Sequence, residues 1–447
     1  MPAVSWLLNT VYIGLLLALS PVLLYRRVVL GKYRDGWAQK FLGRLPERTG
    51  ERPCVWFHAV SVGEVLQLKH VLSKLRTSRP DTEFVISTTT STGLEVARDS
   101  FPNDRVCYFP LDFSWSVRRA IDRVRPTAIV LVELEIWPNF IFAAHAAGVP
   151  LALINGRISE RSYRGYRRIG WLMRRLLGCF QKLAVQNDTY ANRLRGLGAS
   201  VDQIETTGSI KFDGLETSRS NCRTAELRTA FDLADDELVF IAGSTQSPEE
   251  ELALETYEQL RRTHPKLRLV LVPRHKERFD DVARLIRNWG HPLLRRSRIA
   301  SRDLNESNNP VRSIILLDTL GELAACWGLA DIAYVGGSLT KRGGQNMLEP
   351  AAYGAALLFG PNTWNFRDAV ELLLEADAAT VVHNADELTQ AVRQFVEIPQ
   401  RAGELGGRAR QIVLAQQGAT SQTVALVETL LPKPVEPPKL LPQERAA

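Results

Sequence analysis

Glutamates that follow predicted strands are the residues best placed to do chemistry in this chain. Glu64 comes after the apolar run CVWFHAV and a glycine that permits a tight turn, in the first turn of a predicted helix. The helix dipole favours a carboxylate there, so Glu64 is either an ordinary helix-start residue or a general base. Glu133 and Glu135 lie two apart in VELEIWPN. On a strand they would face the same side and repel unless one bends away or meets a cation. Lys211, in TGSIKFD, is either that cation or an exposed loop lysine.

Basic and glycine-rich turns follow predicted strands in the second half. VPRHKERF places Arg274 at a strand end, and arginine suits forked contacts to phosphate. The segment VGGSLTKRGGQNMLEPAAYG holds two glycine pairs, which let the backbone approach a ligand, and then Asn346 and Glu349 at a helix start. A carboxylate such as that of Glu349 can bind a ribose diol. AGSTQSPEEE matches a capped helix start, although its three glutamates would oppose an anion.

Other classes of site lack their sequence patterns. There is no GxxxxGK[ST] loop, GxGxxG fingerprint, HExxH pair or GxSxG elbow. The cysteines show no CxxC or Cys/His spacing typical of metal sites, and we interpret them as reduced core thiols. We therefore expect neither a metal nor a cofactor. The five cysteines are Cys54, Cys107, Cys179, Cys222 and Cys326.

Apolar strands alternate with helical patterns along the body of the chain. Runs such as TAIVLV and PLALIN in the first half, and LVFIAG and LRLVLV in the second, are continuously apolar, as in parallel strands buried on both faces. A chain of 447 residues exceeds the roughly 250 to 300 residues of one core. The predicted fold class is α/β, with two doubly wound Rossmann-like domains whose ligands bind at the carboxyl ends of the strands.

Composition divides the chain into five parts. Residues 1–34 form an apolar N-terminal segment, and residues 35–213 form the first Rossmann-like domain. The polar stretch 214–236 is the expected interdomain linker. Residues 237–430 form the second Rossmann-like domain, and the Pro-rich tail 431–447 is predicted to be disordered.

The N-terminal segment has the length and composition of a membrane-anchoring helix. Residues 4–25 are uncharged and mostly apolar, and RRVVLGKYR follows at once. A signal peptide would carry its charge before the apolar run and a cleavage site after it, and neither is present. The positive-inside tendency predicts a cytoplasmic body. Asn9 and Pro21 weaken a full span, so a helix lying in the membrane interface, or a buried core helix, stays an alternative.

The charge balance leaves the partner open. The net charge is +7, but the 56 basic and 49 acidic residues are interspersed, which does not distinguish nucleic acid, phospholipid and a phosphorylated substrate. In residues 162–178, arginines alternate with aromatic and aliphatic residues at near-helical spacing. This pattern fits either an interfacial helix facing anionic lipid or a solvated helix face packed on the first domain.

An ordered set of segments resembles the Kdo (3-deoxy-D-manno-octulosonic acid) transferases of lipopolysaccharide synthesis. The segments run from HAVSVGE, STTTSTG, VELEIWPN, INGRIS and TGSIKFD to VPRHKERF, DTLGEL, VGGSL, GGQNMLEPAAYG and FGPNTWNF, and the resemblance extends to about Gln417. It implies a GT-B fold, with an acceptor-binding first domain and a second domain that binds the donor CMP-Kdo. It also implies the lipid A precursor lipid IVA as acceptor, at the cytoplasmic face of the inner membrane.

The resemblance also implies roles for individual residues. Glu64 would be the general base of an inverting displacement, and Glu133 and Lys211 would stabilise the transition state. The donor carries a single phosphate, so no metal clamp is implied. The residues implied in CMP binding are Pro273, Arg274, Leu320, Gly321, Glu322, Asn346, Met347, Leu348 and Glu349.

Two kinds of rival remain. Another GT-B enzyme with a different nucleotide sugar, or a sugar-nucleotide epimerase, would share the fold, but an epimerase needs neither anchor nor lipid acceptor. A basic, membrane-attached protein that recruits nucleic acid would account for the charge. It leaves the carboxylates and glycine turns unexplained, so we expect no nucleic-acid partner.

Overall fold

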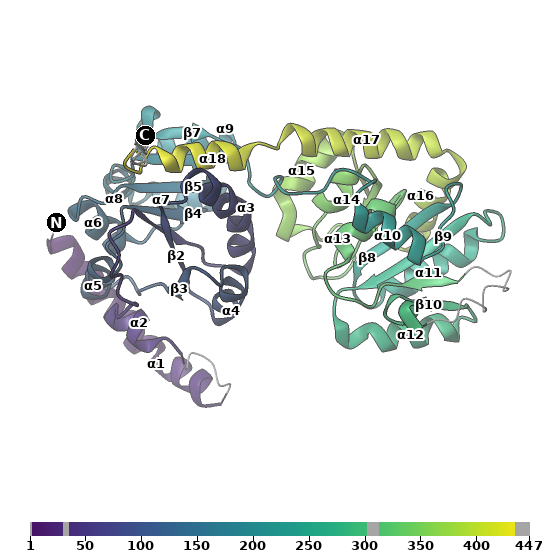
Figure 1. Cartoon of the computed structure of the whole chain (residues 1–447), viewed down its shortest axis with the longest axis horizontal. Coiled ribbons are helices and arrows are strands. Elements are labelled where there is room, and N and C mark those ends of the chain that lie inside the picture. Colours follow the sequence, from purple (N-terminus) through teal and green to yellow (C-terminus); the bar gives the residue numbers. More distant parts are fainter. Residues whose placement is uncertain (1, 30–34, 302–312, 434–447) are drawn as a thin grey trace, which may run out of the picture. The chain divides into compact units, whose positions relative to one another are not determined.

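The computed structural model describes residues 2–29, 35–301 and 313–433 and divides into two compact units (Figure 1). The first unit comprises the described residues up to Asp213 and from Gln417 onward. The second unit is Gly214–Gln416. Each contains one seven-stranded sheet in which every strand pair is parallel, as the continuous apolar runs predict.

The first sheet has the strand order β3-β2-β1-β4-β5-β6-β7. The order reverses between β1 and β4, so the turns after these two strands diverge and leave room for a ligand. Both strands are buried along their whole length. The strands are β1 (Cys54–His58), β2 (Glu83–Thr88), β3 (Arg105–Tyr108), β4 (Ala128–Val132), β5 (Leu151–Gly156), β6 (Lys182–Val185) and β7 (Ile204–Thr206).

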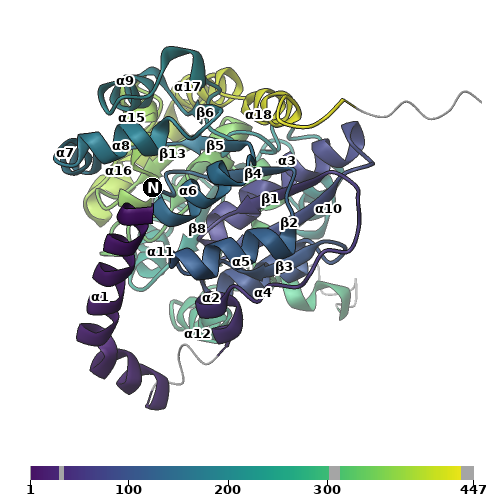
Figure 2. The ribbon, with the colours of Figure 1, turned by 90° about the vertical axis from the view of Figure 1, so that its left-hand side faces the viewer.

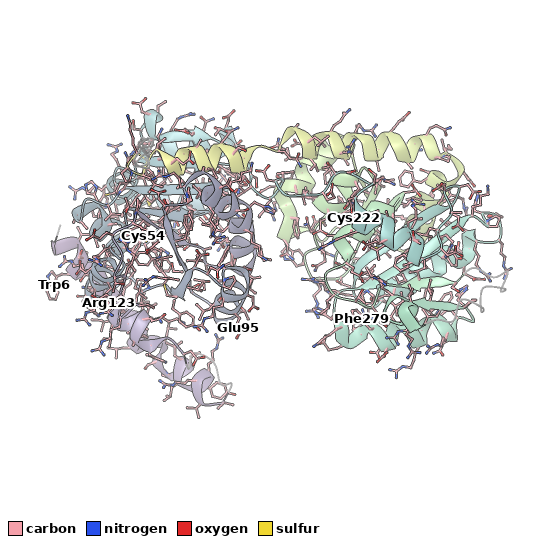
Figure 3. The ribbon with its side chains drawn as sticks, in the orientation of Figure 1. Trp6, Cys54, Glu95, Arg123, Cys222 and Phe279 are labelled. Atoms are coloured by element: carbon pink, nitrogen blue, oxygen red, sulfur yellow. The ribbon has the colours of Figure 1, made fainter. Side chains whose placement is uncertain are left out.

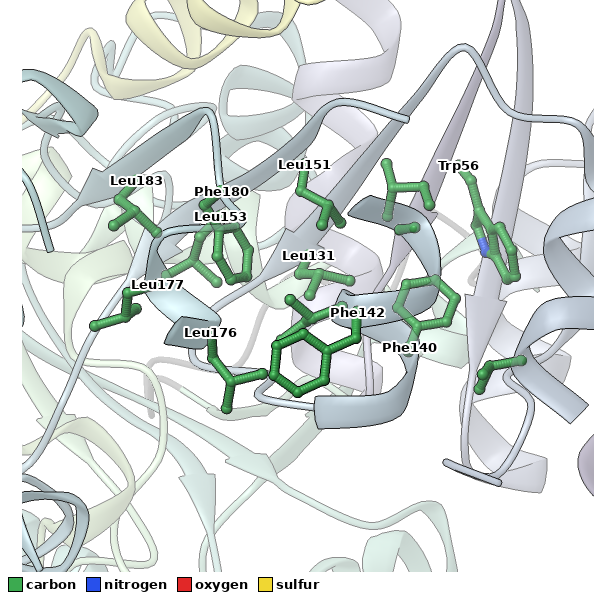
Figure 4. Close-up of a cluster of buried hydrophobic side chains, with 14 of the residues drawn as sticks. Trp56, Leu131, Phe140, Phe142, Leu151, Leu153, Leu176, Leu177, Phe180 and Leu183 are labelled. Carbon is green, nitrogen blue, oxygen red and sulfur yellow. The ribbon is translucent and has the colours of Figure 1, made fainter. Parts of the chain in front are cut away.

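Two apolar clusters cover the faces of this sheet. One is built around Trp56, Leu131 and Phe140 and includes side chains from α5, α6, α8 and α9 (Figure 4). The other lies under α3, α4 and α18. The helices of the first unit are α1 (Pro2–Val28), α2 (Trp37–Leu42), α3 (Val62–Ser78), α4 (Ser91–Ser100), α5 (Ser114–Val124), α6 (Pro138–Ala146), α7 (Glu160–Arg167), α8 (Gly170–Leu177), α9 (Asp188–Gly196) and α18 (Ala419–Glu428).

The second sheet has the order β10-β11-β9-β8-β12-β13-β14, with its reversal between β8 and β12. Its strands are β8 (Leu238–Thr245), β9 (Leu267–Pro273), β10 (Leu293–Arg295), β11 (Ile314–Leu316), β12 (Ile332–Val335), β13 (Ala356–Phe359) and β14 (Thr380–Val381). The α-helices are α10 (Cys222–Ala230), α11 (Glu249–Leu260), α12 (Phe279–Asn288), α13 (Leu323–Cys326), α14 (Leu348–Tyr353), α15 (Arg367–Glu375), α16 (Ala385–Glu397) and α17 (Pro399–Ala415). The two parallel sheets and the helices between their strands confirm the predicted α/β fold class.

The boundaries of the units differ from the expected ones in two places. The stretch 214–236 is not a free linker, because α10 buries Leu227 and contacts α13 of the second unit. Helix α18 belongs to the first unit, where Val424 and Val427 join the cluster under α3, so the second unit ends earlier than residue 430. Leu431, expected in the tail, is buried in the same cluster. The rest of that tail, from residue 434, lies outside the described residues.

Helix α1 is the one helix in the described part of the chain that is long and apolar enough to cross a membrane. It runs through Pro21 without ending. Most of its apolar side chains face outward, with Trp6 72% exposed (Figure 3). Its first half contacts α5 and α6, and Figure 2 shows α1 beside them.

Candidate active site

Glu64 sits at the start of α3, at the carboxyl end of β1. Its backbone N–H donates to the Ser61 hydroxyl (3.3 Å), while its carboxylate accepts from the backbone N–H of Ser61 (3.3 Å) and of Val60 (2.9 Å) and from the Ser61 hydroxyl (2.7 Å). Glu64 therefore does have a helix-start role, because it forms a capping box with Ser61. Glu64 is also only 7% exposed. Burial raises the pKa of its carboxyl, the hydrogen bonds lower it, and the charge of Glu133 raises it.

Glu133 bends away from the strand line, as the repulsion between the paired glutamates requires. It directly follows β4 and adopts a left-handed backbone with φ of 59°, which is uncommon for a residue with a side chain. Its carboxylate accepts a hydrogen bond from Nε of Arg157 (2.8 Å) and lies 3.9 Å from Nζ of Lys211. Lys211 is thus brought to this carboxylate as expected. Arg157, which the sequence analysis left without a role, is the nearer cation.

Glu135, paired with Glu133 in the sequence but given no separate role there, lies in the same region. Its carboxylate accepts a hydrogen bond from the indole of Trp137 (2.9 Å). Burial, and then the charge of Glu64, raise the pKa of Glu135 to about 7. The Trp137 hydrogen bond lowers this pKa, and the charge of Glu133 has a smaller raising effect. Glu64, Glu133 and Glu135 therefore form one acidic cluster at the point where the strand order reverses.

Asn155 links three segments behind the acidic cluster. At the end of β5, with φ of 54°, it donates from Nδ2 to Gln67 of α3 (2.8 Å). Its Oδ1 accepts the backbone N–H of Ile210 (3.3 Å), next to Lys211. One asparagine thus ties the helix of Glu64 to the loop of Lys211. Only the motif INGRIS, read as a strand end, indicated it in the sequence.

Arg274 and Glu349 come together at the carboxyl end of the second sheet. β9 ends at Pro273, and Arg274 follows with an exposed side chain. Burial raises the pKa of Glu349, whereas the Asn346 amide and the charge of Arg274 lower it. Asn346 donates to Glu349 (2.9 Å) and accepts the N–H of Leu348 (3.1 Å). Met347 and Leu348 are buried, so Asn346 and Glu349 are the polar side chains of this segment.

The segment 320–322 combines an exposed leucine side chain with a glycine turn. Leu320 is 72% exposed, and Gly321 has φ of 85°, a conformation that glycine adopts readily. Glu322 is already paired with Arg296 (2.8 Å) and Thr319. Leu320 and Gly321 are therefore the exposed residues of this segment.

The prediction that a side chain caps the start of α11 is wrong. Pro248 is the N-cap, and no side chain caps the helix. Thr245 donates instead to Glu250 (2.8 Å). The buried carboxylate of Glu249 binds the glycine turn after β12 instead. It accepts hydrogen bonds from the N–H groups of Gln246 (2.9 Å), Gly337 (2.7 Å), Ser338 (3.1 Å) and Leu339 (3.1 Å) and from the Tyr334 hydroxyl (3.0 Å).

Comparison with known proteins identifies the family. The family model described as 3-deoxy-D-manno-octulosonic-acid transferase (kdotransferase) matches residues 35–214. A 3-deoxy-D-manno-octulosonic acid transferase of Haemophilus influenzae is 32% identical over 435 residues, which cover 95% of this chain and 99% of that protein. This chain belongs to the Kdo transferase family. A relative of the same name from Bordetella pertussis is 31% identical and covers 84% of this chain and 87% of its own.

The solved structures similar to this Kdo transferase family member show its fold. A UDP-GlcNAc 2-epimerase from Neisseria meningitidis matches with a TM-score of 0.54 at 13% identity, covering 81% of this chain and 99% of that one. MurG of Acinetobacter baumannii matches with a TM-score of 0.50 at 14% identity, covering 85% and 99%. These likenesses support the GT-B arrangement of two Rossmann-like units. The family places the chain among the glycosyltransferases of lipopolysaccharide synthesis.

The remaining candidate ligands of this family member are its cysteines and acidic groups. In residues 2–29, 35–301 and 313–433, no group of three or more His, Cys, Asp or Glu side chains is arranged to hold a metal ion. Cys54, Cys107 and Cys326 are free and buried, as expected of core thiols. Cys222 is free but exposed, which corrects that expectation (Figure 3).

Proposed function

We propose that this protein transfers Kdo from CMP-Kdo to a hydroxyl of lipid IVA, with Glu64 as the general base. The observation that carries the proposal is the acidic cluster at the reversal of the first sheet. Two carboxylates near Glu64 raise the proton affinity of the cluster, and Arg157 and Lys211 compensate Glu133. A base must hold a proton well enough to remove it from a hydroxyl, and this environment favours that.

The hydrogen bonds of Glu64 leave room for an acceptor. A carboxylate offers about four acceptor positions. Val60 and Ser61 use three of them. The remaining position would receive the hydroxyl of the lipid sugar, whose oxygen attacks the anomeric carbon of Kdo as the proton moves to Glu64. The bond from that carbon to the CMP phosphate breaks with inversion, and the electron pair leaves on the phosphate.

The second unit supplies the groups for the departing nucleotide. Arg274 is exposed at a strand end and would stabilise the charge that grows on the CMP phosphate, an effect that is larger in the transition state than in the ground state. Glu349 would accept hydrogen bonds from the ribose hydroxyls, with Asn346 fixing its orientation. The peptide groups of Leu320 and Gly321 would contact CMP, and Lys211 and Glu133 would act at the reacting sugar.

The apolar helix α1 supports a lipid as the acceptor, because it would hold the protein at a membrane. Its outward side chains are apolar over a stretch suited to the hydrocarbon region of a bilayer. The arginine-rich helices α7 and α8 add exposed positive charge and the exposed indole of Trp171 to the same unit. We propose attachment to the inner membrane with both units in the cytoplasm, where lipid IVA can be used without leaving the bilayer.

Glu64→Gln separates the two roles of Glu64. Glutamine at this position keeps a capping box, because its amide oxygen still accepts from the N-cap N–H, but it cannot take a proton. We expect transfer to lipid IVA, followed by mass spectrometry of the lipid, to fall about 10²- to 10⁴-fold with CMP affinity retained. Thermal stability should fall only slightly, because the amide NH₂ loses the hydrogen bond from the Val60 N–H. Glu95→Gln, at an exposed acid on α4 (Figure 3), is the matched control and keeps full activity.

The donor site is tested separately by calorimetry with CMP. Arg274→Ala should weaken CMP binding about tenfold or more, since charge-assisted contacts contribute about 1.5–3 kcal/mol. Lys276→Ala, at an exposed cation two residues away, should leave the affinity unchanged. Normal turnover by Glu64→Gln would remove the general base from the proposal, and lack of any lipid product from the wild-type chain would remove the acceptor.

A further inference from the structure

Two polar side chains of α1, those of Asn9 and Tyr12, form hydrogen bonds to the body of the first unit. Asn9 is 5% exposed, although its neighbours on the helix are largely exposed apolar residues. Its Nδ2 donates to the hydroxyl of Ser114 (2.8 Å), and its Oδ1 accepts the N–H of Ser114 (3.1 Å). An asparagine on a free membrane helix would be costly in hydrocarbon. Here Ser114, at the start of α5, satisfies both polar atoms of the Asn9 amide, so α1 has a defined contact with the rest of the first unit.

One turn further along, Tyr12 reaches a buried carboxylate. The Tyr12 hydroxyl donates to Oδ2 of Asp112 (2.9 Å). The same carboxylate accepts the first-turn N–H groups of α6, from Asn139 (3.0 Å) and Phe140 (2.8 Å). Those groups have no partner within a helix, so Asp112 caps α6. We call the residues that join α1 to this capped start the polar latch: Asn9, Tyr12, Asp112, Ser114 and Asn139.

The helix that Asp112 caps begins directly after the acidic segment of the site. Pro138, the first residue of α6, follows Trp137, whose indole holds the carboxylate of Glu135. The Trp137 ring also packs against Phe109 with centroids 5.8 Å apart, and Phe109 packs against Phe140 at 4.7 Å. A shift in the first turn of α6 therefore displaces the indole that orients Glu135.

We propose that Tyr12 and Asp112 are positioning residues that couple the seating of the apolar helix α1 to the orientation of Glu135 in the acidic cluster. The contacts run from the Tyr12 hydroxyl to Asp112, from Asp112 to the first turn of α6, and from there through Trp137 to Glu135. The membrane-directed helix is then part of the support of the site. A detached tether would carry no hydrogen bond from its apolar stretch to the capped helix.

Tyr12→Phe tests the latch on the full chain in phospholipid nanodiscs. The change removes one hydroxyl and keeps the ring. Thr10→Val is the matched control, since the Thr10 hydroxyl is exposed and bonds only to the Trp6 carbonyl of the same helix (3.0 Å). Amide hydrogen exchange in peptides covering residues 137–142 should quicken about three- to tenfold in Tyr12→Phe, the effect of one lost hydrogen bond, and stay unchanged in Thr10→Val.

Asn9→Leu provides a second variant that suits a lipid environment. It should quicken exchange in the same peptides, because Asn139 loses its contact to Asn9 (3.3 Å) and α5 loses its seat for α1. Equal exchange in the wild type, Tyr12→Phe and Asn9→Leu would overturn the latch. This readout needs no activity, so it stands even if the proposed transfer fails.

The coupling to Glu135 has a readout that rests on the proposed function. The pH dependence of Kdo transfer should shift in Tyr12→Phe, with CMP affinity unchanged, and should keep its wild-type position in Thr10→Val. Faster exchange in α6 together with an unshifted pH dependence would overturn the coupling. Absence of transfer by the wild-type chain would instead count against the proposed function.

Discussion

The carboxylate of Glu133 lies 2.8 Å from Nε of Arg157, on a backbone that has turned into the left-handed region. The turn separates Glu133 from Glu135, and the guanidinium compensates one of the charges in the acidic cluster. Nζ of Lys211 lies 3.9 Å from the same carboxylate, farther away than the guanidinium of Arg157. Arg157 therefore acts on Glu64 through Glu133, whose charge raises the pKa of Glu64.

Arg157→Ala should slow transfer about 10- to 100-fold while CMP affinity stays the same. Without the guanidinium, the negative charge of Glu133 acts more strongly on Glu64 and Glu135, and the transition state loses an oriented cation. Initial rates at saturating CMP-Kdo and lipid measure the effect. Arg161→Ala, at an exposed arginine in the first turn of α7, is the control with wild-type rates. A wild-type rate for Arg157→Ala would show that Lys211 alone suffices.

Glu135→Gln should remove an inflection near pH 7 from the pH dependence of transfer. The pKa of Glu135 is raised to about 7, chiefly by burial, so this carboxyl changes charge close to neutral pH. Glutamine keeps the hydrogen bond from Trp137 but does not titrate. Rates between pH 5.5 and 8.5 would be compared for the two proteins. An inflection that persists in the variant would assign it to another group.

Asp112→Asn should flatten the pH dependence of the stability of the first unit. Burial raises the pKa of Asp112 to about 7, against the lowering effect of the hydrogen bonds from Asn139, Phe140 and Tyr12. The pKa in the folded chain thus lies above the roughly 3.9 of an unfolded aspartate. The stabilisation by the protonated carboxyl is fully present below about pH 4 and is lost as the pH rises through 7.

The slope of this loss is at most about 1.4 kcal/mol per pH unit for one group. Asparagine does not titrate, so the free energy of unfolding of the variant should fall less between pH 4 and 8 than that of the wild type. Chemical denaturation at a series of pH values gives both slopes. Asp99→Asn, at an exposed acid on α4, should keep the wild-type slope. Parallel slopes for the wild type and Asp112→Asn would contradict the prediction.

Glu249→Gln should destabilise the second unit by about 2–3 kcal/mol and weaken CMP binding. The carboxylate accepts from three consecutive N–H groups of the glycine turn after β12, and an amide NH₂ would face those donors. Thermal unfolding and calorimetry with CMP measure the two effects. Glu251→Gln, at an exposed acid in the same helical turn, should match the wild type. An unaltered melting temperature for Glu249→Gln would mean that the turn is held by other contacts.

Much of the sheet architecture was predictable because the central strands are buried along their length and carry continuous apolar runs. The run LVFIAGST coincides with β8, and CVWFHAV contains β1. The start of α3 was equally visible, since Ser61 and Glu64 have the spacing of a capping box. The order of the motifs along the chain then indicated the family, which no single local pattern indicated.

Contacts between residues distant in the sequence were not predictable. Asn9 weakened the prediction of a membrane span, and only the fold shows that Ser114 and Asn139 satisfy its amide. Glu249 looked like one of three helix-start glutamates, yet it reaches a turn about ninety residues later in the chain. The role of Arg157, in the motif INGRIS, was not predictable because its partner Glu133 follows a different strand.

The return of the chain to the first unit affects how the protein is made. Helix α18 packs on α3 and β5 but leaves the ribosome only after the whole second unit. Until then, the apolar surface that receives Val424 and Val427 stays uncovered on the nascent first unit. Such surfaces promote aggregation, so the nascent first unit is prone to aggregate until α18 has been made. A ribosome that stalls before codon 417 releases a first unit without its closing helix.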